Sequence, residues 1–127
     1  YIADNPDDNL GITTFHTNPM LETVTEYIEK HLCENFSVES LCSELYISKS
    51  YLLKLFKNHM QMPPKKYILS RRMNKAQSLL RLGKKPTEVI SLCGFSDYST
   101  FYRSYKNFYG YSPSKEIYTK KIRKIEY

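Results

Sequence analysis

The apolar positions of this chain recur mostly at the spacing of α-helices, with few residues in strict alternation. The first set fits one helix face at i, i+3, i+4, i+7 and i+8: Val24, Tyr27, Ile28, His31 and Leu32. Asn18 can cap this helix, with Pro19 in its first turn. The pattern therefore predicts a helix from about residue 18 to about residue 34.

Two further pairs of helices follow, each pair separated by a short turn. Ser37 and Ser48 can cap the first pair, which the pattern places at about 38–45 and 49–60. Pro86 begins the second pair, and Ser96 or Asp97 caps its second helix, which Gly110 ends. Each pair is therefore a candidate helix-turn-helix unit.

A long helix is predicted between the two pairs, from about residue 64 to residue 82. It begins after the break at Pro63-Pro64 and ends at Gly83, with an apolar stripe at Leu69, Met73, Ala76 and Leu80. A last helix starts at Ser112-Pro113. The fold class is all-α, with two helix-turn-helix lobes joined by a long linker helix and about seven helices.

This pattern divides the chain into five segments. They are an acidic linker or leader (1–17), a first helix-turn-helix lobe (18–62), a linker helix (63–83), a second helix-turn-helix lobe (84–119) and a basic tail (120–127). The first segment shows no periodicity, which favours a linker or a disordered leader.

The second helices of the two pairs are close copies of each other. Residues 48–57 read SKSYLLKLFK and residues 97–106 read DYSTFYRSYK, so Ser50 aligns with Ser99 and Lys54 with Arg103. In both copies the apolar side chains share one face, and basic and hydroxyl side chains share the other. A short helix, a turn and a second helix with a basic outer face is how a helix is presented to the DNA major groove.

The charge distribution agrees with a polyanion partner. Residues 1–47 hold nine acidic side chains and one basic one, whereas residues 48–127 hold eighteen basic and four acidic ones, which together give the net charge of +6. The basic excess begins at the first repeated helix and is typical of a nucleic-acid site. A solvated, solubilising surface is the alternative.

Other classes of protein find no support in the sequence. No run is long enough to span a membrane, and no signal pattern indicates export, so a cytoplasmic location is the default. Cys33, Cys42 and Cys93 have no zinc spacing, and we expect Cys42 and Cys93 to be buried free thiols. No catalytic motif, metal site or cofactor site is evident, so an enzyme is not expected.

Several motifs together resemble a known family. They are S-x-x-Y-L-x-x-x-F-K at 48–57, Y-x-x-x-x-R-M-x-x-A-x-x-L-L at 67–80, G-F-S-D-x-S-x-F-x-R-x-Y-K at 94–106 and G-x-S-P at 110–113. In this order they resemble the DNA-binding domain of AraC/XylS bacterial transcription regulators. The resemblance implies two recognition helices in successive major grooves of double-stranded DNA, because a linker helix of about 28 Å nearly matches a DNA turn of about 34 Å.

The resemblance also implies partners and site residues. A sensing or dimerisation domain ahead of this one and RNA polymerase would be further partners. Base contacts would come from Lys49, Ser50, Leu53, Lys54, Tyr98, Ser99, Thr100, Tyr102 and Arg103. Phosphate contacts would come from Ser48, Lys57, Lys65, Lys66 and Lys106. Lys54 and Arg103 can donate to guanine, and Leu53 could touch a thymine methyl or be an ordinary surface leucine. Lys65 and Lys66 could equally form a solvated face.

Three positions depart from the family pattern. Gln61 stands where a glycine is usual, so either the turn is reshaped or Gln61 adopts a strained positive φ. Ile90 replaces a small residue where two helices pack closely, and Glu116-Ile117 replaces a Tyr-Arg pair. Arg72 matches a linker-helix arginine, for which we expect a structural ion pair.

The alternatives to sequence-specific DNA binding are a helical protein-interaction module and a non-specific nucleic-acid binder.

Overall fold

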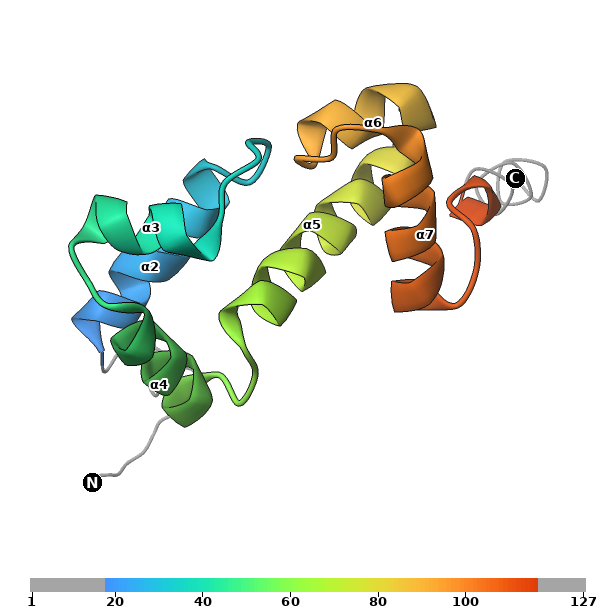
Figure 1. Cartoon of the computed structure of the whole chain (residues 1–127). Helices are drawn as coiled ribbons and strands as arrows, with labels where there is room; N and C mark the ends of the chain where they lie inside the picture. Colours follow the sequence, from blue (N-terminus) through green and yellow to red (C-terminus); the bar gives the residue numbers. More distant parts are fainter. Residues whose placement is uncertain (1–17, 117–127) are drawn as a thin grey trace. The chain divides into compact units, whose positions relative to one another are not determined.

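The computed structural model describes residues 18–116, which form two compact units (Figure 1). The first unit contains residues 18–30 and 37–66, and the second contains residues 31–36 and 67–116. The predicted leader (1–17) and basic tail (120–127) lie outside the described residues. Within residues 18–116 the structure is helical without strands, which confirms the all-α class.

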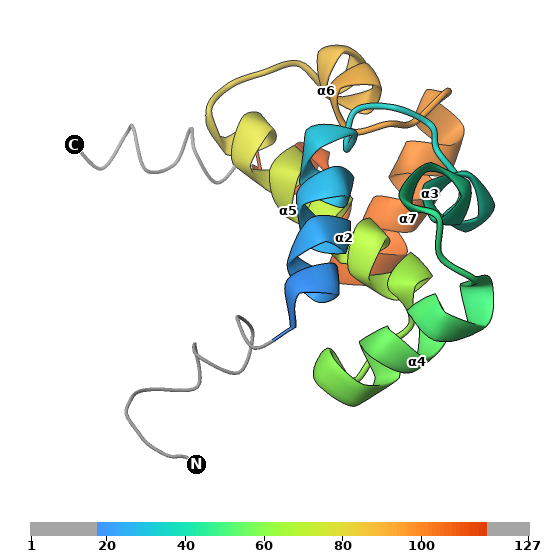
Figure 2. The same ribbon diagram turned by 90° about the vertical axis from the view of Figure 1, so that its left-hand side faces the viewer.

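The first unit contains α2 (Pro19–Lys30), α3 (Val38–Leu45) and α4 (Lys49–His59), seen from a second side in Figure 2. The capping predictions are confirmed, because the side chains of Asn18, Ser37 and Ser48 accept hydrogen bonds from backbone N–H groups one turn into their helices. The core side chains come from all three helices: Leu21, Val24, Ile28, Leu41, Leu52 and Phe56.

The prediction that the first helix continues to about residue 34 is wrong, because α2 ends at Lys30. Residues 31–33 form a turn, in which the Glu34 N–H donates to the His31 carbonyl at 2.9 Å. A guanidinium nitrogen of Arg72 donates to the Glu34 carbonyl at 2.7 Å. The Glu34 carbonyl therefore accepts its hydrogen bond from the Arg72 side chain, and not from the backbone of a further helical turn.

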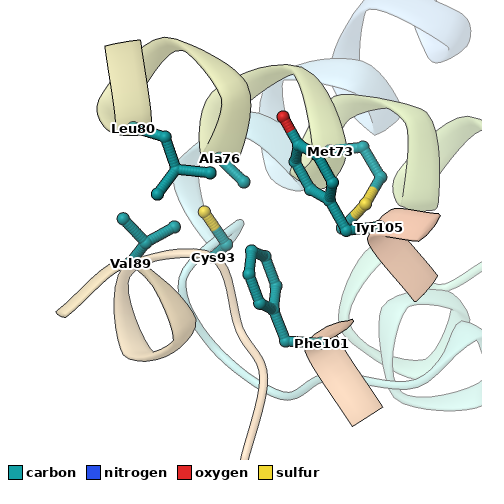
Figure 3. Close-up of a cluster of buried hydrophobic side chains, with 7 residues drawn as sticks. All are labelled: Met73, Ala76, Leu80, Val89, Cys93, Phe101 and Tyr105. Atoms are coloured by element: carbon teal, nitrogen blue, oxygen red, sulfur yellow. The ribbon is translucent and has the colours of Figure 1, made fainter. Parts of the chain in front are cut away.

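The second unit contains most of α5 (Pro64–Arg81), together with α6 (Pro86–Leu92) and α7 (Tyr98–Tyr109). Its core draws side chains from all three helices and from the turn after α6: Met73, Ala76, Leu80, Val89, Cys93, Phe101 and Tyr105 (Figure 3). Gly83 and Gly110 follow α5 and α7 with φ of 100° and 84°, conformations that end a helix. A further helical segment begins at Ser114.

Two of the three departures from the family pattern have a clear local outcome. Gln61 has φ of 55°, which confirms the expected left-handed conformation after α4. Ile90 is half-buried and packs against the core of the second unit, so the larger side chain lies at the edge of the core.

None of the described helices is long and apolar enough to cross a membrane.

Candidate nucleic-acid interface

In the first unit, α3, a tight turn and α4 form a helix-turn-helix. Tyr46 ends α3 in the left-handed conformation, with φ of 57°, and its N–H donates back to the last turn of α3. Two residues later Ser48 caps α4 by accepting from the Tyr51 N–H at 3.0 Å. Burial of Leu52 and Phe56 then turns the opposite face of α4 to solvent.

That outer face of α4 carries the residues expected to contact DNA bases. Lys49, Ser50, Leu53 and Lys54 are all exposed, as is Lys57 farther along the helix. At 3.6 residues per turn they span less than half of the helix circumference. The structure therefore brings these expected contacts together on one surface.

An acidic neighbour of Lys49 was not found by sequence reasoning. The ammonium group of Lys49 donates to a carboxylate oxygen of Glu39 at 2.9 Å, and both side chains are exposed. The hydrogen bond from Lys49, together with the positive charge of its ammonium group, lowers the pKa of Glu39. Glu39 lies in the first turn of α3, where the helix dipole favours a carboxylate.

In the second unit, α6, a turn at 93–97 and α7 form the other helix-turn-helix. Asp97 rather than Ser96 caps α7, because its carboxylate accepts from the Thr100 N–H at 2.8 Å. The Thr100 hydroxyl donates to the other oxygen of the same carboxylate at 3.1 Å. These bonds lower the pKa of Asp97 and occupy the Thr100 hydroxyl in capping.

The outer face of α7 carries the remaining expected base contacts. Tyr98, Ser99 and Arg103 are exposed, whereas Tyr102 is half-buried and its ring lies 6.1 Å from that of Tyr98. Lys106 is exposed one turn after Tyr102. The predicted core aromatics Phe101 and Tyr105 are fully buried on the other side of α7.

The expected phosphate contacts occupy exposed positions in each unit. Lys65 and Lys66 are exposed in the first turn of α5. The Ser48 hydroxyl is engaged as the cap of α4, which leaves it at the positive end of the helix dipole.

The second unit contains a buried carboxylate that sequence reasoning did not identify as important. Glu116 is only 2% exposed and accepts hydrogen bonds from the side chains of four residues. Tyr105 and Tyr111 each donate at 2.7 Å, Arg81 at 2.9 Å and Gln77 at 3.2 Å. The signals in the sequence were that Glu116 is one of four acidic residues in the basic part of the chain, and that Glu116-Ile117 departs from the family pattern.

These donors determine the ionisation of the site. Burial alone would raise the pKa of Glu116, but the bonds from Tyr111, Tyr105, Arg81 and Gln77 outweigh it and lower the pKa to about 2. Burial and the bond to Glu116 raise the pKa of Tyr105. The carboxylate is therefore charged at neutral pH and accepts bonds from neutral phenols on α7 and the following loop.

Arg72 has a structural role, as expected, but its partners differ from the expected carboxylate. Besides the bond to the Glu34 carbonyl, its guanidinium lies over the Phe36 ring, 5.2 Å from the centroid. Gly94 leaves room for it, because a Cβ there would lie 3.0 Å from the guanidinium carbon and 2.8 Å from the Leu32 carbonyl oxygen.

The thiols of Cys42 and Cys93 are buried and free, as expected, and Cys33 is exposed. Burial raises the pKa of Cys93 to about 11. Residues 18–116 hold no cluster of three or more side chains suited to a metal ion.

Comparisons with known proteins agree with this geometry. A family model described as a helix-turn-helix domain matches residues 41–116. The probable transcriptional regulator LumQ of Photobacterium leiognathi is 37% identical over 93 residues, which cover 72% of this chain and 38% of LumQ. The crystal structure of an AraC-type transcriptional regulator from Chromobacterium violaceum matches with a TM-score of 0.71 at 28% identity, covering 80% of this chain and 92% of that one. The chain belongs to the AraC/XylS family of bacterial transcription regulators.

A third comparison bears on DNA directly. The DNA-binding domain of the global transcriptional factor AdpA, solved in complex with a target DNA, matches this AraC-type domain with a TM-score of 0.75 at 26% identity, covering 84% of this chain and 96% of that one. Family membership makes this chain a DNA-binding domain for transcription regulation, not an enzyme. It spans well under half the length of LumQ, which is a larger protein.

Proposed function

We propose that this AraC-type domain binds a specific double-stranded DNA site through two recognition helices, α4 and α7, placed in successive major grooves. The observation that supports this proposal is the repeated unit itself. Each of the two helix-turn-helix units buries one face of its second helix and exposes basic and hydroxyl side chains on the other. The base contacts would come from Lys49, Ser50, Leu53, Lys54, Tyr98, Ser99, Thr100, Tyr102 and Arg103.

Phosphate contacts would anchor these helices without recognising sequence. We assign them to Ser48, Lys57, Lys65, Lys66 and Lys106. Each phosphate neutralised by such a contact contributes about −0.9 to the slope of log affinity against log salt. Binding should therefore weaken steeply as salt rises.

The domain would work as the DNA-binding part of a longer, cytoplasmic bacterial regulator. A separate sensing or dimerisation domain would supply the signal, and contact with RNA polymerase would carry the effect on transcription. The larger size of LumQ supports a longer protein. In this scheme residues 18–62 and 84–119 are the two DNA-binding lobes and residues 63–83 the linker helix.

The decisive experiment is an unbiased selection of duplexes from a random library at near-physiological salt. Two short shared blocks about 10 base pairs apart would support two helices in successive grooves. One block would restrict sequence recognition to one lobe. Tight binding at low salt with no enrichment would favour a non-specific nucleic-acid binder, and absent or salt-insensitive binding would favour a protein-interaction module.

A further inference from the structure

The outer face of α4 contains an apolar side chain in the middle of its basic surface. Leu53 is 44% exposed and lies one helical turn after Lys49 and one turn before Lys57. An exposed leucine by itself needs no explanation. What distinguishes Leu53 is the surface that surrounds it.

Leu53 forms part of the wall of two adjoining hollows in the first unit. The larger has a volume of about 500 Å³ and is lined by Leu53, Lys57, Gln61, Met62 and Pro63. The smaller, of about 140 Å³, shares Leu53 and Pro63 and adds Val38, Glu39, Lys49, Pro64 and Lys65. We call this surface the Leu53 groove. It runs along α4 and brings apolar side chains together next to a basic helix face.

The charges on the Leu53 groove select an anionic occupant. Lys49, Lys57 and Lys65 line it and are exposed, against one carboxylate, Glu39, which is paired with Lys49. A double-stranded DNA offers phosphates to such lysines. In the major groove the base edges present hydrogen-bonding groups and a single apolar group, the C5 methyl of thymine. An apolar groove flanked by lysines on a recognition helix matches this combination.

The ion pair between Lys49 and Glu39 also favours Leu53 as a side chain of this groove that contacts DNA. Its ammonium group is held by Glu39 at 2.9 Å, at the side of the groove. In the domain without DNA the ammonium group of Lys49 is thus paired with a carboxylate, and this bond must be broken before Lys49 can contact a base. Leu53, which lies between Lys49 and Lys57 on α4, can contact a base edge without breaking any such bond.

We infer that Leu53 contacts the C5 methyl group of a thymine and makes the first unit selective for thymine at that base pair. The inference rests on the proposed function and adds the chemical group that the first unit recognises. Met62 and Pro63 provide the apolar surroundings in which the methyl group loses water. Burying one such group accounts for about a fourfold change in affinity.

Replacing thymine by deoxyuridine removes that methyl group and nothing else, so it tests the contact. Each thymine of the block recognised by the first unit is replaced in turn in the selected duplex. At one position deoxyuridine should weaken binding of the wild-type domain about fourfold. With Leu53→Ala the same replacement should have no effect, because the partner of the methyl group is gone.

Leu92→Ala is the matched control, since Leu92 is 40% exposed but lies on α6. It should keep the full sensitivity to deoxyuridine. Sensitivity that persists in Leu53→Ala would overturn the inference, as would deoxyuridine having no effect at any position. In both cases intact, salt-dependent and sequence-specific binding would leave the proposed function standing. Absence of salt-dependent, sequence-specific binding would overturn both the inference and the proposed function.

The Met62 methyl group provides a second, independent measurement. In a domain labelled at its methionine methyl groups, the NMR signal of Met62 should shift on binding the selected duplex and shift less when the critical thymine is deoxyuridine. An acidic peptide of alternating glutamate and leucine serves as the rival occupant. A Met62 shift with this peptide but with no duplex would assign the groove to a protein partner and overturn the inference.

Discussion

The phenol of Tyr105 donates a hydrogen bond of 2.7 Å to the carboxylate of Glu116. Tyr105 lies on the buried face of α7, so this bond joins the recognition helix of the second unit to the segment that begins after Pro113. Arg81 and Gln77 bring α5 to the same carboxylate. The buried carboxylate of Glu116 therefore links α7 to α5, whose side chains pack in the same core.

Removing this carboxylate should destabilise the second unit. Glu116→Ala leaves the Tyr105 hydroxyl buried without its acceptor, a loss of about 2–3 kcal/mol in the free energy of unfolding. Urea unfolding followed by circular dichroism measures the change. Glu44→Gln, which removes an exposed carboxylate from α3, should change stability by less than about 0.5 kcal/mol. Equal effects of the two variants would show that the network contributes little.

The same carboxylate predicts a specific dependence of stability on pH. Folding lowers the pKa of Glu116 from 4.5 to about 2, so the folded state binds its proton less tightly than the unfolded state does. The stabilisation is complete above pH 4.5 and is lost as the pH falls towards 2. Unfolding free energies of the wild type and Glu116→Gln, measured across this range, should differ by an amount that shrinks on acidification. A constant difference would contradict the lowered pKa.

Local sequence signals predicted most of the fold. Side-chain caps such as Ser37 and Asp97 need only the next turn of their own helix, so their residue types reveal them. The turn after α2 was not predicted, and its Glu34 carbonyl accepts a hydrogen bond from Arg72, thirty-eight residues away in the sequence. No periodicity can report a contact of that range.

The candidate interface was predicted less completely than the fold. The repeat and its helical phase placed Lys54 and Arg103 on exposed faces. The pairing of Lys49 with Glu39 and the role of Glu116 depend on tertiary packing, because each joins side chains from different elements. An acidic residue in a basic chain looks the same in sequence whether it is buried or exposed.

The left-handed conformation of Gln61 predicts a stabilising substitution. With φ of 55° its Cβ is crowded, a cost of about 1–2 kcal/mol that glycine avoids. Glycine gains backbone freedom in the unfolded state, so the net stabilisation by Gln61→Gly should be about 0.5–1 kcal/mol. The midpoint of urea unfolding measures it, and Gln61→Ala, which keeps the Cβ, should show no such gain. A gain with alanine as well would point to the side chain rather than to backbone strain.

Arg103 should discriminate between bases. Arg103→Ala is expected to cost about 1–3 kcal/mol of binding to the selected duplex and to relax preference at one base pair. Lys106→Ala, on the same exposed side of α7, should instead weaken binding to all sequences and make the salt slope shallower by about 0.9. Binding of each variant to a set of single-base-pair mutants gives both quantities. Uniform loss with Arg103→Ala would mean that this side chain contacts only the backbone.

Glu39 should lower the affinity of the domain for DNA, because it forms an ion pair with Lys49. Glu39→Gln releases the ammonium group from its bond of 2.9 Å, so one more positive charge becomes available to DNA. Affinity should rise, and the salt slope should steepen by about 0.9 if the lysine neutralises one phosphate. Folding stability should change by less than about 1 kcal/mol, because the pair is exposed.

The control for Glu39→Gln is Glu44→Gln, which removes the same charge from the same helix. Both variants weaken the repulsion between the domain and DNA, but only Glu39→Gln frees a lysine on the outer face of α4. Adding Lys49→Ala to Glu39→Gln should abolish the steeper slope, since the freed group is then absent. If Glu39→Gln and Glu44→Gln alter affinity and slope equally, the effect comes from net charge alone, and the pair does not govern how Lys49 meets DNA.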